Sequence, residues 1–298
     1  MVKVGIIGVG GWISDQHLRA YSKISGVKTL AICDLNKENL KTFSQKYNIP
    51  YTFEDYHQML ESEELNAVSV VLPTYLHCSV TIEALEKGKD VLVEKPMAIN
   101  SQEAEQMAQK AKEKKKVLMV GMCRRFLPEF QFLKNLVEKG ELGGIYYIKT
   151  RLFRRKTFPH GFSTWFKEES KSGGGVLIDT GVHMLDLSLW LADNFNATSV
   201  CGTTYNKFGD NVEDMATALV RLDNGTAVSL EVAWELFRES KTEYFLELFG
   251  TKGSAKVQPL ETPLLKIYKE IEGRDVEIAH KFPSEIGIAD GEIAHFIE

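Results

Sequence analysis

Short apolar runs that alternate with amphipathic stretches over residues 1–122 constrain the fold of this chain more than any other feature. The runs are VKVGIIGV, VKTLAICD, AVSVVLP, DVLVEKP and KVLMVGM, at residues 2–9, 27–34, 67–73, 90–96 and 116–122. Near-continuous apolar runs of this length are typical of strands buried on both faces of a parallel sheet. Their alternation with helical patterns predicts right-handed crossovers, and hence a Rossmann-like, doubly wound α/β domain over residues 1–122.

After about Arg124 the pattern changes to longer runs with period-two alternation. These runs lie at residues 145–155, 198–207, 215–223, 226–236, 243–250 and 265–270. Asn224-Gly225, between two of them, is a strong hairpin signal. Residues 123–298 are therefore predicted to form an α+β domain with a large, mostly antiparallel sheet. Such a sheet can bury a broad face against a second copy, so we expect a homodimer or homotetramer.

Charge and cysteine usage exclude several classes of protein. The net charge of −5 gives no basic footprint for a nucleic-acid backbone. The cysteines lie far apart with no C-x-x-C spacing, which favours reduced thiols over a disulfide framework. No run reaches the ~20 apolar residues of a membrane span, and the N-terminal run is too short for a secretory signal. We therefore expect a cytoplasmic protein with no nucleic-acid or membrane partner.

The first strand runs into GVGGWISDQHL, which carries most of a dinucleotide-binding fingerprint. Gly8 and Gly10 take its first two glycine positions, and Ile13 stands where a third glycine or alanine is usual. Such a turn brings a pyrophosphate to the N-terminus of the following helix. Asp34 ends the second strand, where its carboxylate would bind the adenosine ribose hydroxyls and repel a 2′-phosphate.

This pattern predicts a site for NAD in preference to NADP. The residues expected there are Gly8, Gly10, Gly11, Trp12, Ile13 and Asp34. The alternative is a glycine turn in a domain of the same shape that binds no nucleotide.

The segment GGGVLIDTGVHML, residues 173–185, places an acid and an imidazole in an apolar stretch. Asp179 and His183 are four residues apart and would share one face of a helix. Burying them is costly unless they are paired or employed. The alternatives are a self-satisfied pair, or half of a metal site that lacks a third ligand because the chain has no H-E-x-x-H motif and no Cys/His cluster. We therefore expect no metal.

Lys95 completes a plausible catalytic set for oxidation of a secondary alcohol. It ends a strand, and open α/β sheets bind ligands at the carboxyl ends of their strands. Pro96 follows, and a cis bond there would aim the ammonium into the crevice. Lys95 would stabilise a developing alkoxide, and an imidazole such as His183 suits proton transfer at neutral pH. Asp179 would hold a second substrate hydroxyl or fix the imidazole.

The segments GVGGWISDQHL, LPTYLH, VEKPMA, GMCRRFLPEF and SGGGVLIDTGVHMLDL, in this order, resemble the glucose–fructose oxidoreductase, inositol dehydrogenase and MocA-like family (Gfo/Idh/MocA). The resemblance implies that Lys95, Asp179 and His183 form the catalytic centre and contact the substrate. It also implies a cofactor-lining turn from Pro73 to His77 and a cofactor contact at Arg125. Cys123 stands where many members carry Asn.

Other residues complete the expected site. Glu94, before Lys95, would bind the nicotinamide ribose. Trp165, with His160, would line the substrate pocket or belong to an exposed flap or subunit contact. His17, His57, His280 and His295 belong to no recognisable constellation and receive no role. Family members usually continue beyond GEIAHFIE by a few tens of residues, so we expect either a trimmed chain or a short member.

These features favour an NAD(H)-dependent oxidoreductase acting on a secondary alcohol or ketone of a sugar, polyol or sugar derivative. One alternative is a nucleotide-sensing regulator with the same fold and no turnover. Another keeps the enzyme and changes the substrate to a non-sugar diol, carbonyl or imine, because function lies in the site and not in the scaffold.

Overall fold

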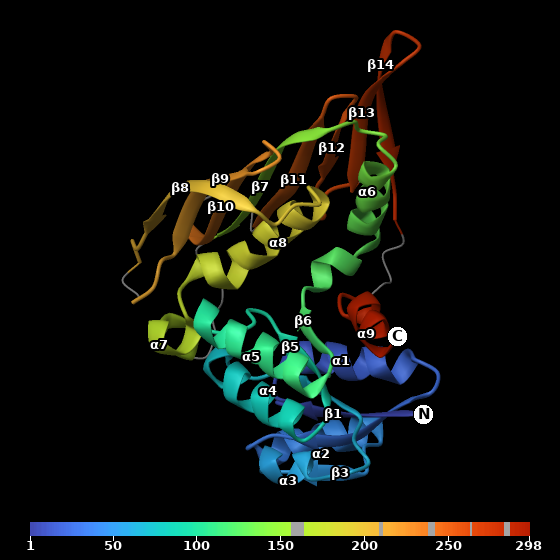
Figure 1. Ribbon diagram of the computed structural model, residues 1–298, viewed down its shortest axis with the longest axis vertical. Helices are drawn as coiled ribbons and strands as arrows, with labels where there is room; N and C mark the ends of the chain where they lie inside the picture. Colours follow the sequence, from blue (N-terminus) through green and yellow to red (C-terminus); the bar gives the residue numbers. More distant parts are fainter. Residues whose placement is uncertain (156–163, 209–210, 238–241, 263, 283–286) are drawn as a thin grey trace. The chain divides into compact units, whose positions relative to one another are not determined.

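The computed structural model describes residues 1–155, 164–208, 211–237, 242–262, 264–282 and 287–298. The chain divides into two compact units (Figure 1): Met1–Phe126 together with Ile286–Glu298, and Leu127–Glu285. The last helix, α9 (Asp290–Ile297), therefore belongs with the first unit although it is last in the sequence. The domain boundary predicted between residues 122 and 123 stays a prediction.

The first unit is built on a parallel sheet with the strand order β3-β2-β1-β4-β5-β6. Its strands are β1 (Val2–Ile7), β2 (Val27–Cys33), β3 (Tyr51–Phe53), β4 (Ala67–Val70), β5 (Asp90–Glu94) and β6 (Leu118–Gly121). The order reverses beside β1, which makes this edge the topological switch point where doubly wound sheets bind ligands. The predicted Rossmann-type sheet is confirmed, and β3 is a short strand that the hydrophobic pattern does not reveal.

Helices connect these strands as the alternation predicts. They are α1 (Trp12–Lys23), α2 (Lys37–Tyr47), α3 (Tyr56–Leu60), α4 (His77–Glu86) and α5 (Ser101–Lys114), with short turns η1 (Thr74–Leu76) and η2 (Cys123–Phe126). Asn100 caps α5, since its side-chain oxygen accepts a 2.9 Å hydrogen bond from the Glu103 amide. Asn36 caps α2 in the same way. Both helix starts are thus fixed by local chemistry.

The second unit is built on a sheet with the strand order β14-β13-β12-β11-β7-β10-β9-β8. Its strands are β7 (Ile145–Arg155), β8 (Ala197–Tyr205), β9 (Met215–Leu222), β10 (Ala227–Leu236), β11 (Thr242–Gly250), β12 (Ser254–Val257), β13 (Leu265–Ile271) and β14 (Arg274–His280). The pairing of β7 with β10 is parallel, and the other strand pairs among the described residues of this sheet are antiparallel. The predicted α+β fold with a mostly antiparallel sheet is confirmed.

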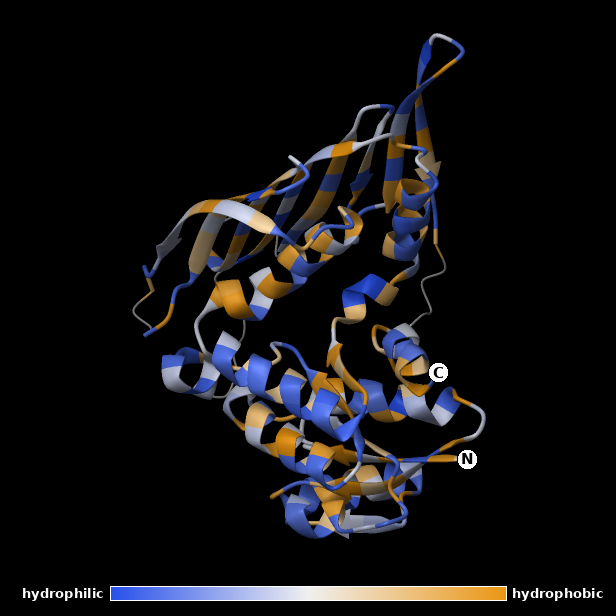
Figure 2. Cartoon of the chain, in the orientation of Figure 1, coloured by the Kyte–Doolittle hydropathy of each residue, from blue (hydrophilic) through white to orange (hydrophobic). Residues whose placement is uncertain are grey.

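One face of this sheet is covered by helices. They are α6 (Pro128–Glu138) and α8 (Val182–Leu191). Between β7 and α8 lie the short elements η3 (Thr164–Lys167), α7 (Glu169–Ser172) and η4 (Leu177–Gly181). Figure 2 shows apolar and polar residues alternating along the strands, as a sheet with one covered face requires. Ile148 and Leu152 of β7 pack in one core cluster with Met184 and Leu187 of α8. This packing fixes the segment that carries Asp179 and His183.

The predicted turn and the predicted state of the cysteines also agree with the structure. Gly225 has a φ of +87° between β9 and β10, as the Asn-Gly hairpin signal requires. All of the cysteines are free thiols, and only Cys201 is exposed. Among the residues described, no helix has the length and apolar character needed to cross a membrane.

Candidate functional site

The glycine turn after β1 is shaped by close backbone packing. Gly8 has a φ of +93°, and a Cβ there would lie 2.1 Å from the carbonyl oxygen of Val71. A Cβ on Gly10 would lie 2.7 Å from the Asn39 side-chain nitrogen. Only glycine fits at Gly8, because both its backbone conformation and its neighbour exclude a side chain. The sequence signal for a tight turn therefore has a steric cause in the structure.

Asp34 is tied to this turn by its carboxylate. One oxygen, Oδ2, accepts a 2.9 Å hydrogen bond from the Val9 amide, and Oδ1 accepts a 2.8 Å bond from the Asn36 amide. These bonds hold the carboxylate at the carboxyl end of β2, beside the glycine turn. The structure thus brings Gly8, Gly10 and Asp34 together at one sheet edge.

The N-terminus of α1 begins at Gly11. Gly11 is the N-cap residue, and among the described residues no side chain caps the amides of the first turn. The Ser14 hydroxyl accepts a bond from the Gly11 amide and donates one to the Gly11 carbonyl oxygen. A Cβ on Gly11 would meet nothing within 4 Å. Trp12 is 65% exposed beside it, and Ile13 is partly buried. The helix start is therefore open toward solvent, and its positive dipole end suits an anionic group.

Glu94 and Lys95 stand at the carboxyl end of β5. The Glu94 side chain is nearly buried, and its Oε2 accepts a 3.1 Å hydrogen bond from the Lys95 amide. The backbone of β6 leaves room for this carboxylate, because a Cβ on Gly121 would lie 3.2 Å from Glu94 Oε1. Lys95 is partly buried, and the Lys95–Pro96 peptide bond is cis. Both residues thus lie at the edge of the sheet formed by the carboxyl ends of its strands, as predicted.

His77 connects two loops at this same edge. Its Nδ1 faces the carbonyl oxygen of Pro96 at 2.8 Å, and its Nε2 faces that of Leu72 at 2.8 Å. Burial lowers the pKa of His77, although both carbonyls favour the protonated ring. Pro73 precedes η1, and its carbonyl accepts a bond from the Leu76 amide. His77 therefore fastens the turn after β4 to the turn after β5, and a cofactor contact by Pro73 or His77 stays a prediction.

Asp179 lies in η4, a π-helical turn that runs directly into α8. Such wide turns recur at functional sites. The Asp179 Oδ2 accepts hydrogen bonds from the indole of Trp234, at 3.0 Å, and from the Thr180 hydroxyl, at 3.1 Å. His183 follows in the first turn of α8 and is partly buried. Trp234 of β10 is a positioning residue that the sequence pattern does not identify, because it lies 55 residues away in an ordinary strand.

The glycines before this turn pack against their own unit. A Cβ on Gly175 would lie 1.9 Å from the carbonyl oxygen of Glu213, so no larger residue fits. The Glu213 carboxylate accepts hydrogen bonds from the amides of Gly175, at 2.8 Å, and Leu177, at 2.9 Å. The close approach that the structure shows at Gly175 is to Glu213 of the same unit.

The remaining predicted residues occupy short turns. Arg125 lies partly buried in η2. Trp165 lies in η3, where its ring stacks on Phe166 with 3.9 Å between the ring centroids. His160 lies outside the described residues. No role at a bound ligand follows from these positions alone, and those assignments stay predictions.

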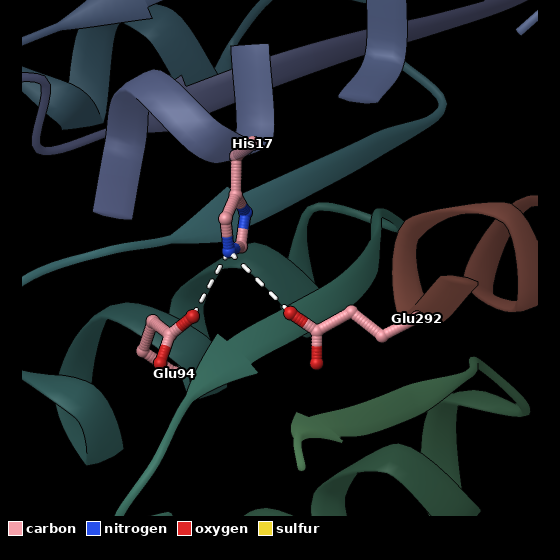
Figure 3. A group of neighbouring side chains, drawn as sticks. All are labelled: His17, Glu94 and Glu292. Carbon is pink, nitrogen blue, oxygen red and sulfur yellow. Dashed lines mark hydrogen bonds and ion pairs between the residues drawn. The ribbon is translucent and has the colours of Figure 1, made fainter. Parts of the chain in front are cut away.

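The sequence places His17 in no constellation, and here the structure corrects that prediction. Its Nε2 lies 2.9 Å from Oε1 of Glu94 and 4.0 Å from Oε1 of Glu292 (Figure 3). Nothing in the local sequence reveals this group, because Glu94 and Glu292 are 77 and 275 positions further along the chain. The sequence offers one weak signal for a buried polar group: Ser14, His17 and Tyr21 form a polar stripe on the buried face of α1.

The fold and the glycine turn together define the class of protein: one with a Rossmann-type unit of the dinucleotide-binding kind and a second, α+β unit. The model of an oxidoreductase family with an NAD-binding Rossmann fold matches residues 2–122. The model of the GFO/IDH/MocA C-terminal domain matches residues 130–256. The chain belongs to the GFO/IDH/MocA oxidoreductase family, which confirms the resemblance seen in its motifs.

Named relatives are distant in sequence. The chain is 29% identical over 273 residues to D-glucoside 3-dehydrogenase of Escherichia coli strain K12, covering 87% of this chain and 77% of the relative. It is 29% identical over 263 residues to scyllo-inositol 2-dehydrogenase (NAD(+)) of Bacillus subtilis strain 168, covering 85% and 72%. A solved structure of levoglucosan dehydrogenase with NADH and levoglucosan superposes with a TM-score of 0.88 at 22% identity, covering 99% of this chain and 88% of that one. The last similarity shows the shared fold.

Proposed function

We propose that this protein is an NAD-dependent dehydrogenase that interconverts a secondary alcohol and a ketone on a sugar, a polyol or a sugar derivative. The observation that carries the proposal is the fixed carboxylate of Asp179, held by Trp234 in a π-helical turn one helical turn before His183. An oriented acid beside an imidazole is suited to a substrate with neighbouring hydroxyls, one held and one reacting. The relatives named for a glucoside and an inositol support the same substrate class.

The residues at the edge of the first sheet fit a dinucleotide. Gly8 and Gly10 remove the side chains that would block a close approach, and the start of α1 at Gly11 is open to an anion. Asp34 presents a carboxylate to a ribose diol and would repel a 2′-phosphate, which favours NAD over NADP. Lys37, the nearby cation, pairs with Glu54 at 2.9 Å. The oxidised nicotinamide supplies the hydride acceptor when it is bound.

The chain's own residues then have distinct tasks. The Lys95 ammonium stabilises negative charge that develops on the substrate oxygen. The His183 imidazole accepts the proton of the reacting hydroxyl and returns it in the reverse direction. Asp179, oriented by Trp234, accepts a hydrogen bond from a second substrate hydroxyl. Glu94 accepts a hydrogen bond from the ribose next to the nicotinamide.

Two substitutions test these assignments. Lys95→Ala and His183→Asn should each lower kcat by about 10²–10⁴ with the active substrate, because each removes one group that acts in the transition state. The dissociation constant for NADH, measured by fluorescence titration, should stay within about twofold of wild type. Lys112→Ala and His57→Asn change exposed side chains of the same types and should leave both quantities unaltered.

The substrate is found first, by a screen of sugars, inositols and sugar acids with NAD⁺, monitored by the absorbance of reduced nicotinamide. Near-normal rates in both variants would disprove the assigned roles while leaving the activity standing. A screen in which non-sugar diols, carbonyls or imines alone are turned over would disprove the substrate class. NADH binding without turnover of any substrate would instead favour the nucleotide-sensing regulator.

A further inference from the structure

Three buried ionisable side chains from distant parts of the sequence meet inside the first unit (Figure 3). They are His17 of α1, Glu94 at the end of β5 and Glu292 of α9. His17 and Glu292 have no exposed side-chain surface, and Glu94 has 11%. Buried charges of this kind must be compensated, because removing a carboxylate from water is costly.

Two of the three side chains compensate each other. His17 Nε2 lies 2.9 Å from Glu94 Oε1, which is the distance of a good hydrogen bond. The second oxygen of Glu94 accepts the Lys95 amide, and Gly121 leaves space for the carboxylate. Glu94 is therefore held by a hydrogen bond at each of its oxygens, beside the lysine proposed to act on the substrate.

Glu292 is not compensated in the same way. Within the part of the chain that the structure describes, neither of its carboxylate oxygens has a hydrogen-bond partner, and the nearer one lies 4.0 Å from His17 Nε2. A second carboxylate with full negative charge would compete with Glu94 for the one imidazole. It would also repel Glu94 inside a site that water does not reach.

We infer that α9 supplies a positioning residue: Glu292 stands as an uncharged carboxylic acid on the Nε2 side of His17, so that the imidazole pairs with Glu94 alone and Glu94 is fixed beside Lys95. The helix that comes last in the sequence thereby completes the ligand-binding edge of the first unit. The expected effect of Glu292 on cofactor binding rests on the proposed role of Glu94. Its expected effect on the pH dependence of folding does not.

The groups that face Glu292 support this charge state. They are His17 and Tyr21 from α1, Glu94 from β5 and Cys123 from η2. Burial raises the pKa of the Tyr21 hydroxyl and of the Cys123 thiol, so both stay uncharged at neutral pH. Burial, and then the charge of Glu94, raises the pKa of Glu292 well above its ordinary value. On the outer side of α9, Asp290 pairs with Lys23 at 2.6 Å and does not enter the cluster.

A divalent cation between the three groups would be another way to neutralise them. The second ring nitrogen of His17 argues against it. Metal-bound imidazoles almost always donate from their other nitrogen to an acceptor. Nδ1 of His17 is buried and has no such acceptor among the described residues. The geometry therefore points to a proton and not to a metal ion.

Glu292→Gln tests the charge state, because glutamine has the shape of the neutral acid and cannot ionise. The folding equilibrium constant of each variant is measured by urea unfolding between pH 4 and pH 8. If Glu292 is neutral when folded, the unfolded chain alone ionises as the pH rises above its ordinary pKa. The folding equilibrium constant of Glu292→Gln, divided by that of wild type, should then rise about tenfold per pH unit above roughly pH 5. Glu105→Gln, at an exposed site on α5, should give a flat ratio.

A flat or falling ratio for Glu292→Gln would show an ionised Glu292 and overturn the inference. Stabilisation of wild type by Zn²⁺ or Mn²⁺, lost in Glu292→Gln and reversed by chelator, would overturn it in favour of a metal site. Both outcomes are read without any enzyme assay.

The positioning role is read from NADH titrations of Glu292→Ala, Glu292→Gln and Glu94→Gln. Glu292→Ala should weaken NADH binding about as much as Glu94→Gln does, while Glu292→Gln should bind like wild type. Unaltered binding by a folded Glu292→Ala protein would overturn the positioning role. Unaltered binding by Glu94→Gln would instead disprove the proposed contact of Glu94 with the cofactor, and the pH measurement would still decide the charge state of Glu292.

Discussion

The two units both place closely packed glycines ahead of a helix, and they use the helix start in opposite ways. In the first unit, Gly8 and Gly10 lead into α1, whose start at Gly11 is open and has no side-chain cap among the described residues. In the second unit, Gly174 and Gly175 lead into η4. There the Glu213 carboxylate accepts hydrogen bonds from the amides of Gly175 and Leu177. The same signature thus precedes an open helix start in one unit and an internally satisfied one in the other. The difference between the two helix starts is that the described part of the chain supplies a carboxylate to the amides of the second one and not to those of the first.

The largest effect should come from the glycine that is packed against Glu213. Gly175→Ala forces a methyl group into a space where it would lie 1.9 Å from a carbonyl oxygen, so the backbone must move. We expect a loss of about 3 kcal/mol or more in the free energy of unfolding, measured with urea. Gly11→Ala meets nothing within 4 Å and is the matched control, with an expected change near zero. Equal stability of the two variants would contradict the steric account of this comparison.

A smaller effect should follow from removing the charge that fills the second helix start. Glu213→Gln keeps the size of the side chain but removes its negative charge. It also leaves one acceptor oxygen in place of the two that accept hydrogen bonds from the Gly175 and Leu177 amides. We expect the free energy of unfolding to fall by about 2 kcal/mol, because hydrogen bonds to charged groups are the stronger ones. Glu270→Gln, at an exposed position of β13, should leave it unaltered in the same urea titration. A wild-type value for Glu213→Gln would mean that this helix start does not depend on its carboxylate.

The smallest effect concerns the open helix start and its neighbour Asp34. Asp34→Asn removes the charge that would repel a 2′-phosphate and weakens an acceptor for the ribose. We expect the preference for NADH over NADPH to narrow by about tenfold in fluorescence titrations, which corresponds to ~1.4 kcal/mol. Tighter binding of NADPH than of NADH by the wild-type protein would reverse the inferred preference.

Much of the fold follows from the sequence because its signals are local. The apolar runs at residues 2–9 and 90–96 contain β1 and β5, and Asn100 caps α5 through a bond to an amide three residues away. The strands β3, β12 and β14 are absent from the predicted runs. Of these, β3 and β12 have only three and four residues, too few to establish a pattern. The roles of the site residues remain proposals, although the structure places Lys95 and Asp34 at the sheet edge that the pattern predicts.

The sequence by itself determined which residues stand at the turns and strand ends, because backbone conformation and hydrophobic period are written in neighbouring positions. Only the tertiary structure decided which of those residues find a partner. Trp234 reaches Asp179, Glu213 closes the glycine turn, and Glu292 joins His17 and Glu94 from the far end of the chain. Such pairings depend on long-range packing, and no local pattern along the chain carries that information.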